Sequence, residues 1–209
     1  MINQDWVMAD PVPLPVRDTR SRIVEAAMEL FWAKGYGSTS TSDILERAGI
    51  NSGSLYHFFP GKQDLLVAVL EAYRDGIGPM LLEPAWAGVD DPIDRIFALL
   101  ARYRELIILT DCSYGCPIGS LALELHEPDP AVRERMAENF TAWTRAIQSC
   151  LEAAEPPLPA SVDRAALAEF ALHVMEGGVM LARTYRDVAY FDRAVAQLRF
   201  HIQLMGRQT

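Results

Sequence analysis

The side chains most able to do chemistry are the cysteines, histidines and acidic residues, and their spacing supports neither catalysis nor a metal site. Cys112 and Cys116 lie four residues apart, but no second pair of ligands accompanies them, and the four histidines are scattered. His173 and Glu176 share a face of a predicted helix, which an ordinary surface or interface pair explains. The sequence contains no glycine-rich phosphate loop, nucleophile elbow or carboxylate dyad. We therefore expect a protein that is not an enzyme and has no cofactor or metal.

A polar and aromatic stretch at residues 51–62, NSGSLYHFFPGK, indicates a different chemistry. It opens with the small or polar residues Ser52, Gly53 and Ser54, whereas a bulky apolar group there would hold a helix away from a DNA groove. Leu55 and Phe59 fall on the opposite face, which must pack against the preceding helices. The stretch is interpreted as a recognition helix, with a short packing helix that has a solvated serine edge as the alternative.

Three further side chains of this stretch suit phosphate oxygens. In the same arrangement the phenol of Tyr56 and the imidazole of His57 lie toward the groove walls. Lys62 begins the next helix, so its ammonium and the free amides there both favour a phosphate. Thr39 and Ser42, at the start of the preceding helix, are placed for backbone or groove-edge contacts.

Helical periodicity predicts the elements that position these residues. Residues 19–34 show the apolar stripe of an amphipathic helix that Gly35 can end, and Asp18 or Thr19 can cap its start. Ser40 and Asp43 resemble a capping box that opens a second short helix. The turn AGIN then has the length that separates the two helices of a helix-turn-helix.

The rest of the chain is also expected to be helical. A long helix begins near residue 62, and it is weakened or bent by glycines and prolines from residue 76 onward. Further helices are predicted at 92–110, 117–126, 129–154, 161–186 and 190–206. The predicted fold is all-α, with an N-terminal three-helix helix-turn-helix head and a C-terminal helical bundle. We expect a flexible arm at 1–16, a DNA-binding domain at 17–61, and an effector-binding and dimerisation domain at 62–209.

Composition narrows the class of protein further. The 209 residues carry a net charge of −9, which is unfavourable for coating nucleic acid non-specifically. Half of the residues are hydrophobic, enough to bury a core. Three cysteines fit a reducing cytoplasm. No signal peptide and no uninterrupted apolar run of membrane-spanning length is seen, so we expect a cytoplasmic location without a membrane partner.

Residues 19–70 closely resemble the DNA-binding head of TetR/AcrR-type transcriptional repressors. The resemblance rests on AAMELFWAKGY, DILERAGI, GSLYHFFPGK and DLL, which occur in that order without gaps. It implies a homodimer whose head binds operator DNA and whose body binds a small effector. The implied DNA contacts are Thr39, Ser42, Ser52, Gly53, Ser54, Tyr56, His57 and Lys62.

This sequence departs from the family pattern at two of those positions. Residues 42 and 52 are often basic in the family, and both are serine here. Fewer cationic contacts predict a shallower dependence of operator affinity on salt. The arginines Arg17, Arg20 and Arg22 can compensate by reaching phosphates.

The body is expected to hold the dimer interface and the effector pocket. The apolar surfaces of the last two helices, about 161–206, fit a four-helix interface between two subunits, with Gly177 and Gly178 allowing close approach. An apolar or aromatic effector that releases the operator is the leading hypothesis, with the helix that begins at Lys62 linking body to head. Each candidate pocket residue can equally belong to the ordinary core: Phe97, Tyr103, Tyr114, Cys116, Phe140, Trp143 and Met175.

A redox or electrophile sensor is the alternative hypothesis. The segment GCPIGSLALEL resembles the start of the sixth helix in a subgroup of these repressors, and some related members sense oxidants there through a cysteine. Cys116 precedes Pro117 at a predicted helix start, where the helix dipole favours a thiolate. The simpler interpretation, which we favour, is that Cys116 is buried and inert.

Overall fold

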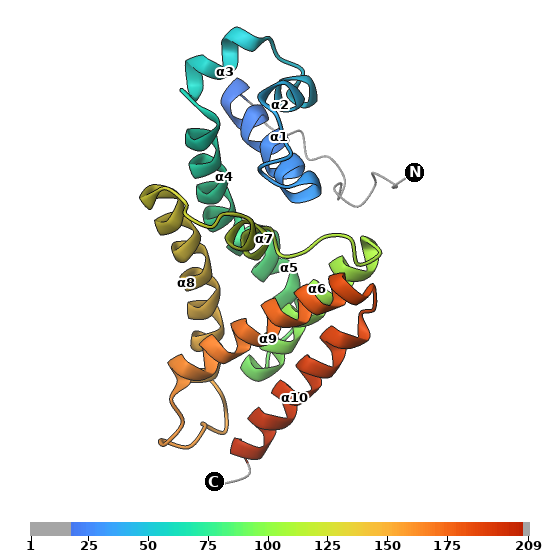
Figure 1. The fold of residues 1–209 in the computed structure, drawn as a ribbon. Helices are drawn as coiled ribbons and strands as arrows, with labels where there is room; N and C mark the ends of the chain where they lie inside the picture. Colours follow the sequence, from blue (N-terminus) through green and yellow to red (C-terminus); the bar gives the residue numbers. More distant parts are fainter. Residues whose placement is uncertain (1–17, 207–209) are drawn as a thin grey trace.

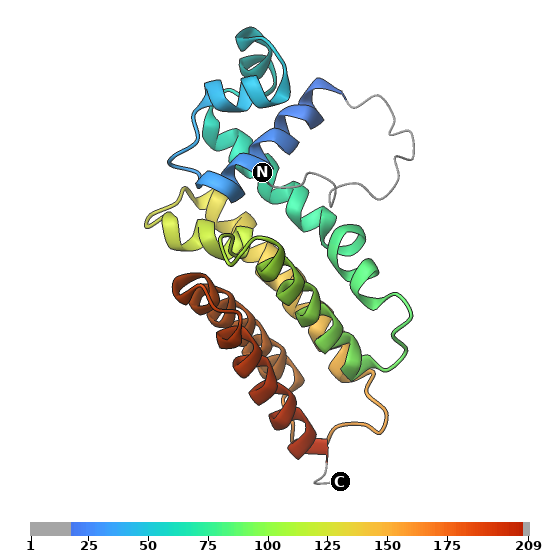
Figure 2. The same cartoon turned by 90° about the vertical axis from the view of Figure 1, so that its right-hand side faces the viewer.

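The structure is a computed structural model, and it describes residues 18–206. These residues form helices and no strand, which confirms the predicted all-α fold. The molecule is elongated, with α1, α2 and α3 at one end and α9 and α10 at the other (Figures 1 and 2). Between them, α4 descends from the head into the body beside α8 (Figure 1). The predicted arm at 1–16 lies outside the described residues.

The head and the first long helix match the predicted elements closely. Their bounds are α1 (Thr19–Lys34), α2 (Thr41–Ala48), α3 (Ser52–Phe58) and α4 (Lys62–Gly76). The side chain of Asp18 accepts a hydrogen bond from the amide of Ser21 at 2.7 Å and caps α1. Ser40 and Asp43 form the predicted capping box of α2. Asn51 occupies the N-cap position of α3, but its side chain makes no capping hydrogen bond.

The helical geometry changes at the end of α4. A π-helical segment, η2 (Ile77–Leu82), and the short α5 (Glu83–Trp86) follow α4 directly. The glycines and prolines from residue 76 onward were expected to weaken the helix here, and Pro79 supplies no amide hydrogen. The remaining helices are α6 (Pro92–Leu109), α7 (Pro117–Glu124), α8 (Pro130–Glu152), α9 (Arg164–Tyr185) and α10 (Ala189–Gly206).

Two hydrophobic clusters hold these helices together. One cluster joins α1, α2 and α3 to the buried face of α4, and Cys116, Ile118, Leu121 and the start of α8 also belong to it. The other fills the body between α6, α8, α9 and α10. Because α4 and α7 both pack within the first cluster, the head is built onto two body elements at once.

Helix α9 has apolar residues on most of its surface. It is long and apolar enough to cross a membrane by length and composition alone, with a mean hydropathy of 1.4. Here it packs against α8 and α10, and Gly178 lies so close to Phe191 of α10 that a methyl group at 178 would stand 2.9 Å from that ring. Gly178 therefore serves packing within the chain, whereas Gly177 has nothing within 4 Å of such a methyl group.

Candidate DNA-binding and effector sites

The recognition helix α3 is anchored by one face and exposed on the other. Leu55 has none of its surface exposed and Phe59 has 3%, so both pack into the head as predicted. On the other side Tyr56 is 59% exposed, and Gly53 and His57 are exposed as well. Ser42 of α2 is also exposed. The side chains of Ser52 and Ser54 lie outside the described part of the chain.

Thr39 does not face outward, in contrast to its predicted contact with DNA. Only 1% of its surface is exposed, and its hydroxyl donates toward the carbonyl oxygens of Gly35 at 2.7 Å and Leu30 at 3.3 Å. The Gly35 carbonyl lies at the C-cap of α1, beyond the last amide of the helix that could pair with it. The side chain of Thr39 therefore closes the end of α1 inside the head, and its hydroxyl is not exposed for the predicted contact with DNA.

Lys62 also turns into the head, although it was predicted to grip a phosphate. Its ammonium donates to the carbonyl oxygen of Tyr36 and stands 4.1 Å from the centre of the Tyr36 ring. Partial burial lowers the pKa of Lys62, and the charge of Glu124 opposes that shift. The ammonium thus ties the start of α4 to the turn after α1.

Two arginines of α1 also contact groups within the head. The guanidinium of Arg22 donates to the carbonyl oxygens of Ala48, at 2.5 Å, and Gly49, at 3.2 Å, and so caps the end of α2. Arg20 lies over the ring of Phe59 at 5.2 Å. The interior contacts of Arg22 do not match its expected role at phosphates, and Arg17 lies outside the described residues.

The head and the body meet at α7, a junction that sequence reasoning did not anticipate. The carboxylate of Glu124 accepts hydrogen bonds from the amides of Tyr36, at 3.0 Å, and Gly37, at 2.5 Å. Before the other end of α7, the carbonyl oxygen of Gly115 accepts a hydrogen bond from the Trp32 indole at 2.7 Å. Helix α7 is therefore fastened to the head at both ends. The sequence shows Glu124 only as an acidic residue near the end of a short predicted helix. Its partners are 87 and 88 residues away in the sequence, so no local pattern indicated the contact.

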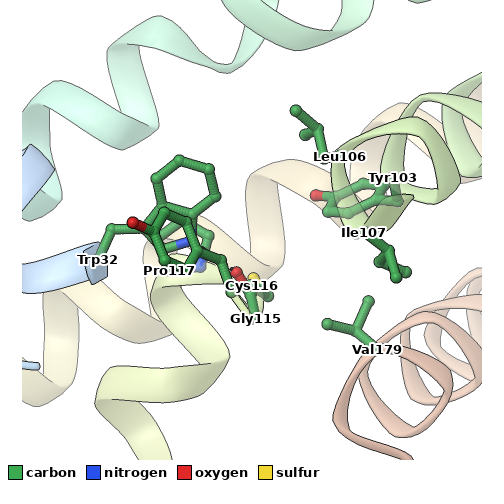
Figure 3. Close-up of a pocket in the computed structure, with 9 residues that line it drawn as sticks. Trp32, Tyr103, Leu106, Ile107, Gly115, Cys116, Pro117 and Val179 are labelled. Carbon is green, nitrogen blue, oxygen red and sulfur yellow. Dashed lines mark hydrogen bonds between the residues drawn. The ribbon is translucent and has the colours of Figure 1, made fainter. Parts of the chain in front are cut away.

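Two adjoining cavities lie on the body side of this junction. The smaller, of about 30 Å³, is walled by side chains from α1, α6 and α9 and by the residues that lead into α7. Figure 3 shows Cys116 and Pro117 on one side of it, with Tyr103, Ile107 and Val179 facing them. The larger, of about 550 Å³, opens between α7 and α9 and falls within the size range of small-molecule pockets. Gly115, Cys116 and Val179 line both cavities.

The predicted pocket residues divide between these cavities and the core. Tyr103, Tyr114 and Cys116 line the smaller cavity, and Cys116 and Phe140 line the larger one. Trp143 is buried next to them, with 3% of its surface exposed.

Three of the predicted pocket residues, Phe97, Trp143 and Met175, line neither cavity. Phe97 and Met175 belong to the body core, and the guanidinium of Arg199 covers the Phe97 ring at 3.7 Å. These side chains are therefore core residues and do not line an effector pocket.

The pKa of the Cys116 thiol is raised, whereas a position at a helix start would lower it. Burial raises its pKa well above the ordinary value for a thiol, and the neighbouring carboxyl of Glu176 raises it further. Hydrogen bonds from the amides of Ile118 and Gly119 lower this pKa, but desolvation outweighs them. The thiol is therefore protonated at neutral pH, which agrees with a buried and inert cysteine and not with the thiolate of the alternative hypothesis.

Within the described residues, no group of three or more histidine, cysteine or acidic side chains could hold a metal ion. The cavities are instead lined by aromatic and aliphatic side chains, with a few polar groups converging beside Cys116. An exposed recognition helix on a helix-turn-helix, joined to a helical body, defines a DNA-binding transcription regulator.

Comparison with known proteins identifies the family. Residues 23–69 match the model of bacterial regulatory proteins of the tetR family, and residues 92–197 match the C-terminal domain of LmrA/YxaF-like transcriptional regulators. The chain is 32% identical over 190 residues to the HTH-type transcriptional regulator Rv0196 of Mycobacterium tuberculosis, covering 86% of this chain and 92% of that protein. It is 28% identical to LmrA of Bacillus subtilis, with 81% and 89% covered.

Solved structures agree with this assignment. A regulatory protein TetR from Rhodobacter sphaeroides superposes with a TM-score of 0.79 at 25% identity, covering 88% of this chain and 98% of that one. The reduced form of NemR from Escherichia coli shares the fold, with a TM-score of 0.75 at 23% identity over 87% and 95% of the two chains. This chain belongs to the TetR family of bacterial transcription regulators, which bind operator DNA, act as dimers and are not enzymes.

Proposed function

We propose that the protein is a repressor that a small apolar or aromatic effector releases from its operator. The observation that supports this most is the combination of an exposed recognition helix with a cavity behind the element that fastens head to body. In this proposal Ser52, Gly53 and Ser54 face bases, while Tyr56 and His57 bond phosphates. Ser42 contributes at the groove edge.

The operator is the first thing to establish. Sequencing of DNA fragments selected by the purified protein should return a palindrome, because the recognition helices of a dimer read two half-sites about 34 Å apart. On that operator, Tyr56→Phe and His57→Ala are expected to weaken binding to most sequences alike, since phosphate contacts carry no base information. His126→Ala, an exposed histidine of the body, is the matched control. Full operator affinity in both variants would contradict the proposed docking.

We further propose that the homodimer forms through about 161–206. Large apolar side chains remain exposed on the outer faces of α9 and α10, and the rings of Phe170 and His201 pack edge to face at 5.9 Å across the two helices. A monomer would leave this apolar strip in water. Its members on α9 are Phe170, Leu181 and Tyr185, and on α10 they are Phe200 and Leu204.

Sedimentation of Leu181→Glu and Phe200→Glu tests this interface. A glutamate at either position would be buried against apolar side chains of the partner subunit without a compensating charge, so each variant should sediment as a monomer where the wild type is dimeric. Met80→Glu replaces an even more exposed apolar residue, in η2, and should stay dimeric. Dimers in all three variants would place the interface elsewhere.

The route from effector to operator follows from the two body elements that reach the head. In this proposal residues 17–61 form the DNA-binding domain and 62–209 the effector and dimer domain, with α4 and α7 crossing between them. A ligand in the larger cavity touches the start of α7, whose other end holds the amides of Tyr36 and Gly37 through Glu124. A shift of α7 would change the tilt of the heads, and two heads must match successive grooves. We also propose a cytoplasmic location, because a bacterial regulator must reach its operator DNA there.

A further inference from the structure

Two polar atoms beside the cavities have no hydrogen-bond partner among the described residues. They are the indole nitrogen of Trp143 in α8 and one carboxyl oxygen, Oε1, of Glu176 in α9. Both atoms are almost fully shielded, and a buried polar group without a partner is costly. Glu176 itself lines the larger cavity. The Trp143 indole lies near the Tyr103 hydroxyl of the smaller cavity but does not form a well-aligned hydrogen bond with it.

The carboxyl of Glu176 is held in this place by close packing against α7. A methyl group at Gly119 would collide with the other carboxyl oxygen, Oε2, so only glycine lets the two helices approach this closely. The Cys116 thiol interacts with the same carboxyl group. The carboxyl of Glu176 therefore lies against α7 at the cavity wall.

No positive charge compensates Glu176 within the described part of the chain. Burial raises its pKa, and among its neighbours only the Cys116 thiol opposes that shift. Arg183 and Arg186 line the same cavity, but neither forms an ion pair with Glu176. Arg186 instead donates to the carbonyl oxygen of Asp111, at 3.1 Å, and the hydroxyl of Ser113, at 2.7 Å.

We propose that the effector is an apolar or aromatic molecule that carries a protonated amine, and that the amine pairs with Glu176 inside the larger cavity. This inference rests on the proposed function and specifies the ligand class of its effector site. The apolar body contacts Phe140 and Val179, and the ammonium supplies the hydrogen bond and the charge that Oε1 lacks. A neutral ligand satisfies one of these needs, and an anionic ligand neither.

Three probes of nearly equal shape test the charge preference. They are 1-naphthylmethylamine, 1-naphthylmethanol and 1-naphthoate, titrated calorimetrically into the full-length protein at neutral pH. We expect the amine to bind at least about tenfold more tightly than the alcohol, which is the lower end for a charge-assisted hydrogen bond in a desolvated site. The carboxylate should show no binding.

Variants then assign the preference to Glu176. Glu176→Gln keeps the shape and removes the charge, so the amine should lose its tenfold advantage while the alcohol binds as before. Glu169→Gln changes an exposed glutamate about two turns earlier on α9 and should leave all three affinities unchanged. Operator binding by Glu176→Gln, measured without probe, shows that the variant is folded.

The outcomes separate this inference from the proposed function. Binding of all three probes with equal affinity, or an amine preference that survives Glu176→Gln, would overturn the cationic ligand and leave an effector site of another class. Failure of every probe to bind or to weaken the operator complex would count against the cavity as an effector site, and so against both proposals.

Discussion

The contact between Glu124 and the turn after α1 provides the sharpest prediction about how head and body are joined. One carboxylate accepts hydrogen bonds from the amides of Tyr36 and Gly37, at 3.0 and 2.5 Å. Glu124→Ala removes both acceptors, and Glu124→Gln retains one neutral oxygen. We expect the alanine variant to loosen the turn and the glutamine variant to loosen it about half as much.

The free-energy cost of Glu124→Ala depends on how exposed the two hydrogen bonds are. A hydrogen bond to a charged group contributes about 1.5–3 kcal/mol, and two would contribute about 3–6 kcal/mol. Ordering the glutamate side chain costs up to about 2 kcal/mol. Glu124 and Gly37 are exposed, so freed amides regain bonds to water. We therefore expect a net local loss of about 1–2 kcal/mol, a factor of about 5–30 in the opening equilibrium.

Hydrogen exchange measures this opening directly. The amides of Tyr36 and Gly37 should exchange about 5–30 times faster in Glu124→Ala. Amides in α9 should be unaffected. Glu127→Ala, which changes an exposed glutamate just beyond α7, is the matched control. Unchanged exchange at both amides in Glu124→Ala would refute the idea that this carboxylate fastens head to body.

Three further predictions concern buried groups. Thr39→Val should lower the free energy of unfolding by about 1–2 kcal/mol, because the carbonyl oxygen of Gly35 loses its donor, and operator affinity of the folded protein should remain unchanged. Gly119→Ala should displace the carboxyl of Glu176 from the cavity wall, because the added methyl group collides with it, and Glu176→Gln in the same chain should not relieve a collision of shape. Glu176→Gln alone should stabilise the protein at pH 8 relative to wild type, and less so at pH 4.

The sign of this pH dependence follows from the raised pKa of Glu176. Burial raises it above the ordinary 4.5, so between the two pKa values the folded state holds a proton that the unfolded state releases. Stability from this residue is complete below about pH 4.5 and declines as pH rises through the folded pKa. Thermal unfolding at several pH values measures the difference. A Glu176→Gln stabilisation that is equal at pH 4 and pH 8 would contradict it, and Glu169→Gln should show no pH-dependent effect.

Operator titrations decide between the two roles of Thr39. If Thr39→Val weakens the operator complex selectively while the unfolding free energy is unchanged, the hydroxyl contacts DNA after all. Thr41→Val, at the first position of α2 and only partly buried, is the nearest comparison in the same turn.

Local sequence was sufficient for the helices and their ends. Ser40 and Asp43, Gly35 and Gly49 act through atoms within five residues of themselves, so the spacing of residue types already determines where α1 and α2 begin and end. The buried anchors Leu55 and Phe59 were predictable for the same reason, because helical periodicity assigns each residue to a face.

Long side chains were less predictable, since several partners compete for each one. Lys62 and Arg22 reach carbonyl oxygens 26 residues away in the sequence, and no local pattern distinguishes that partner from a phosphate. Their charge was evident from the sequence, but their direction was set by the packing of α4 and α1. Helix α9 shows the same limit, because it is apolar on most sides and periodicity alone did not separate its core face from its exposed face.

By itself, the sequence determined that the chain is all-α, that its first helices form a helix-turn-helix, and which face of α3 is buried. Those properties depend on residue types a few positions apart, which act before any tertiary contact exists. Only the tertiary structure decided that Glu124 holds the head and that Glu176 stands without a cation at a cavity wall. It also decided that Cys116 keeps its proton, since desolvation and the charge of Glu176, 60 residues away in sequence, exist only after α7 and α9 pack together.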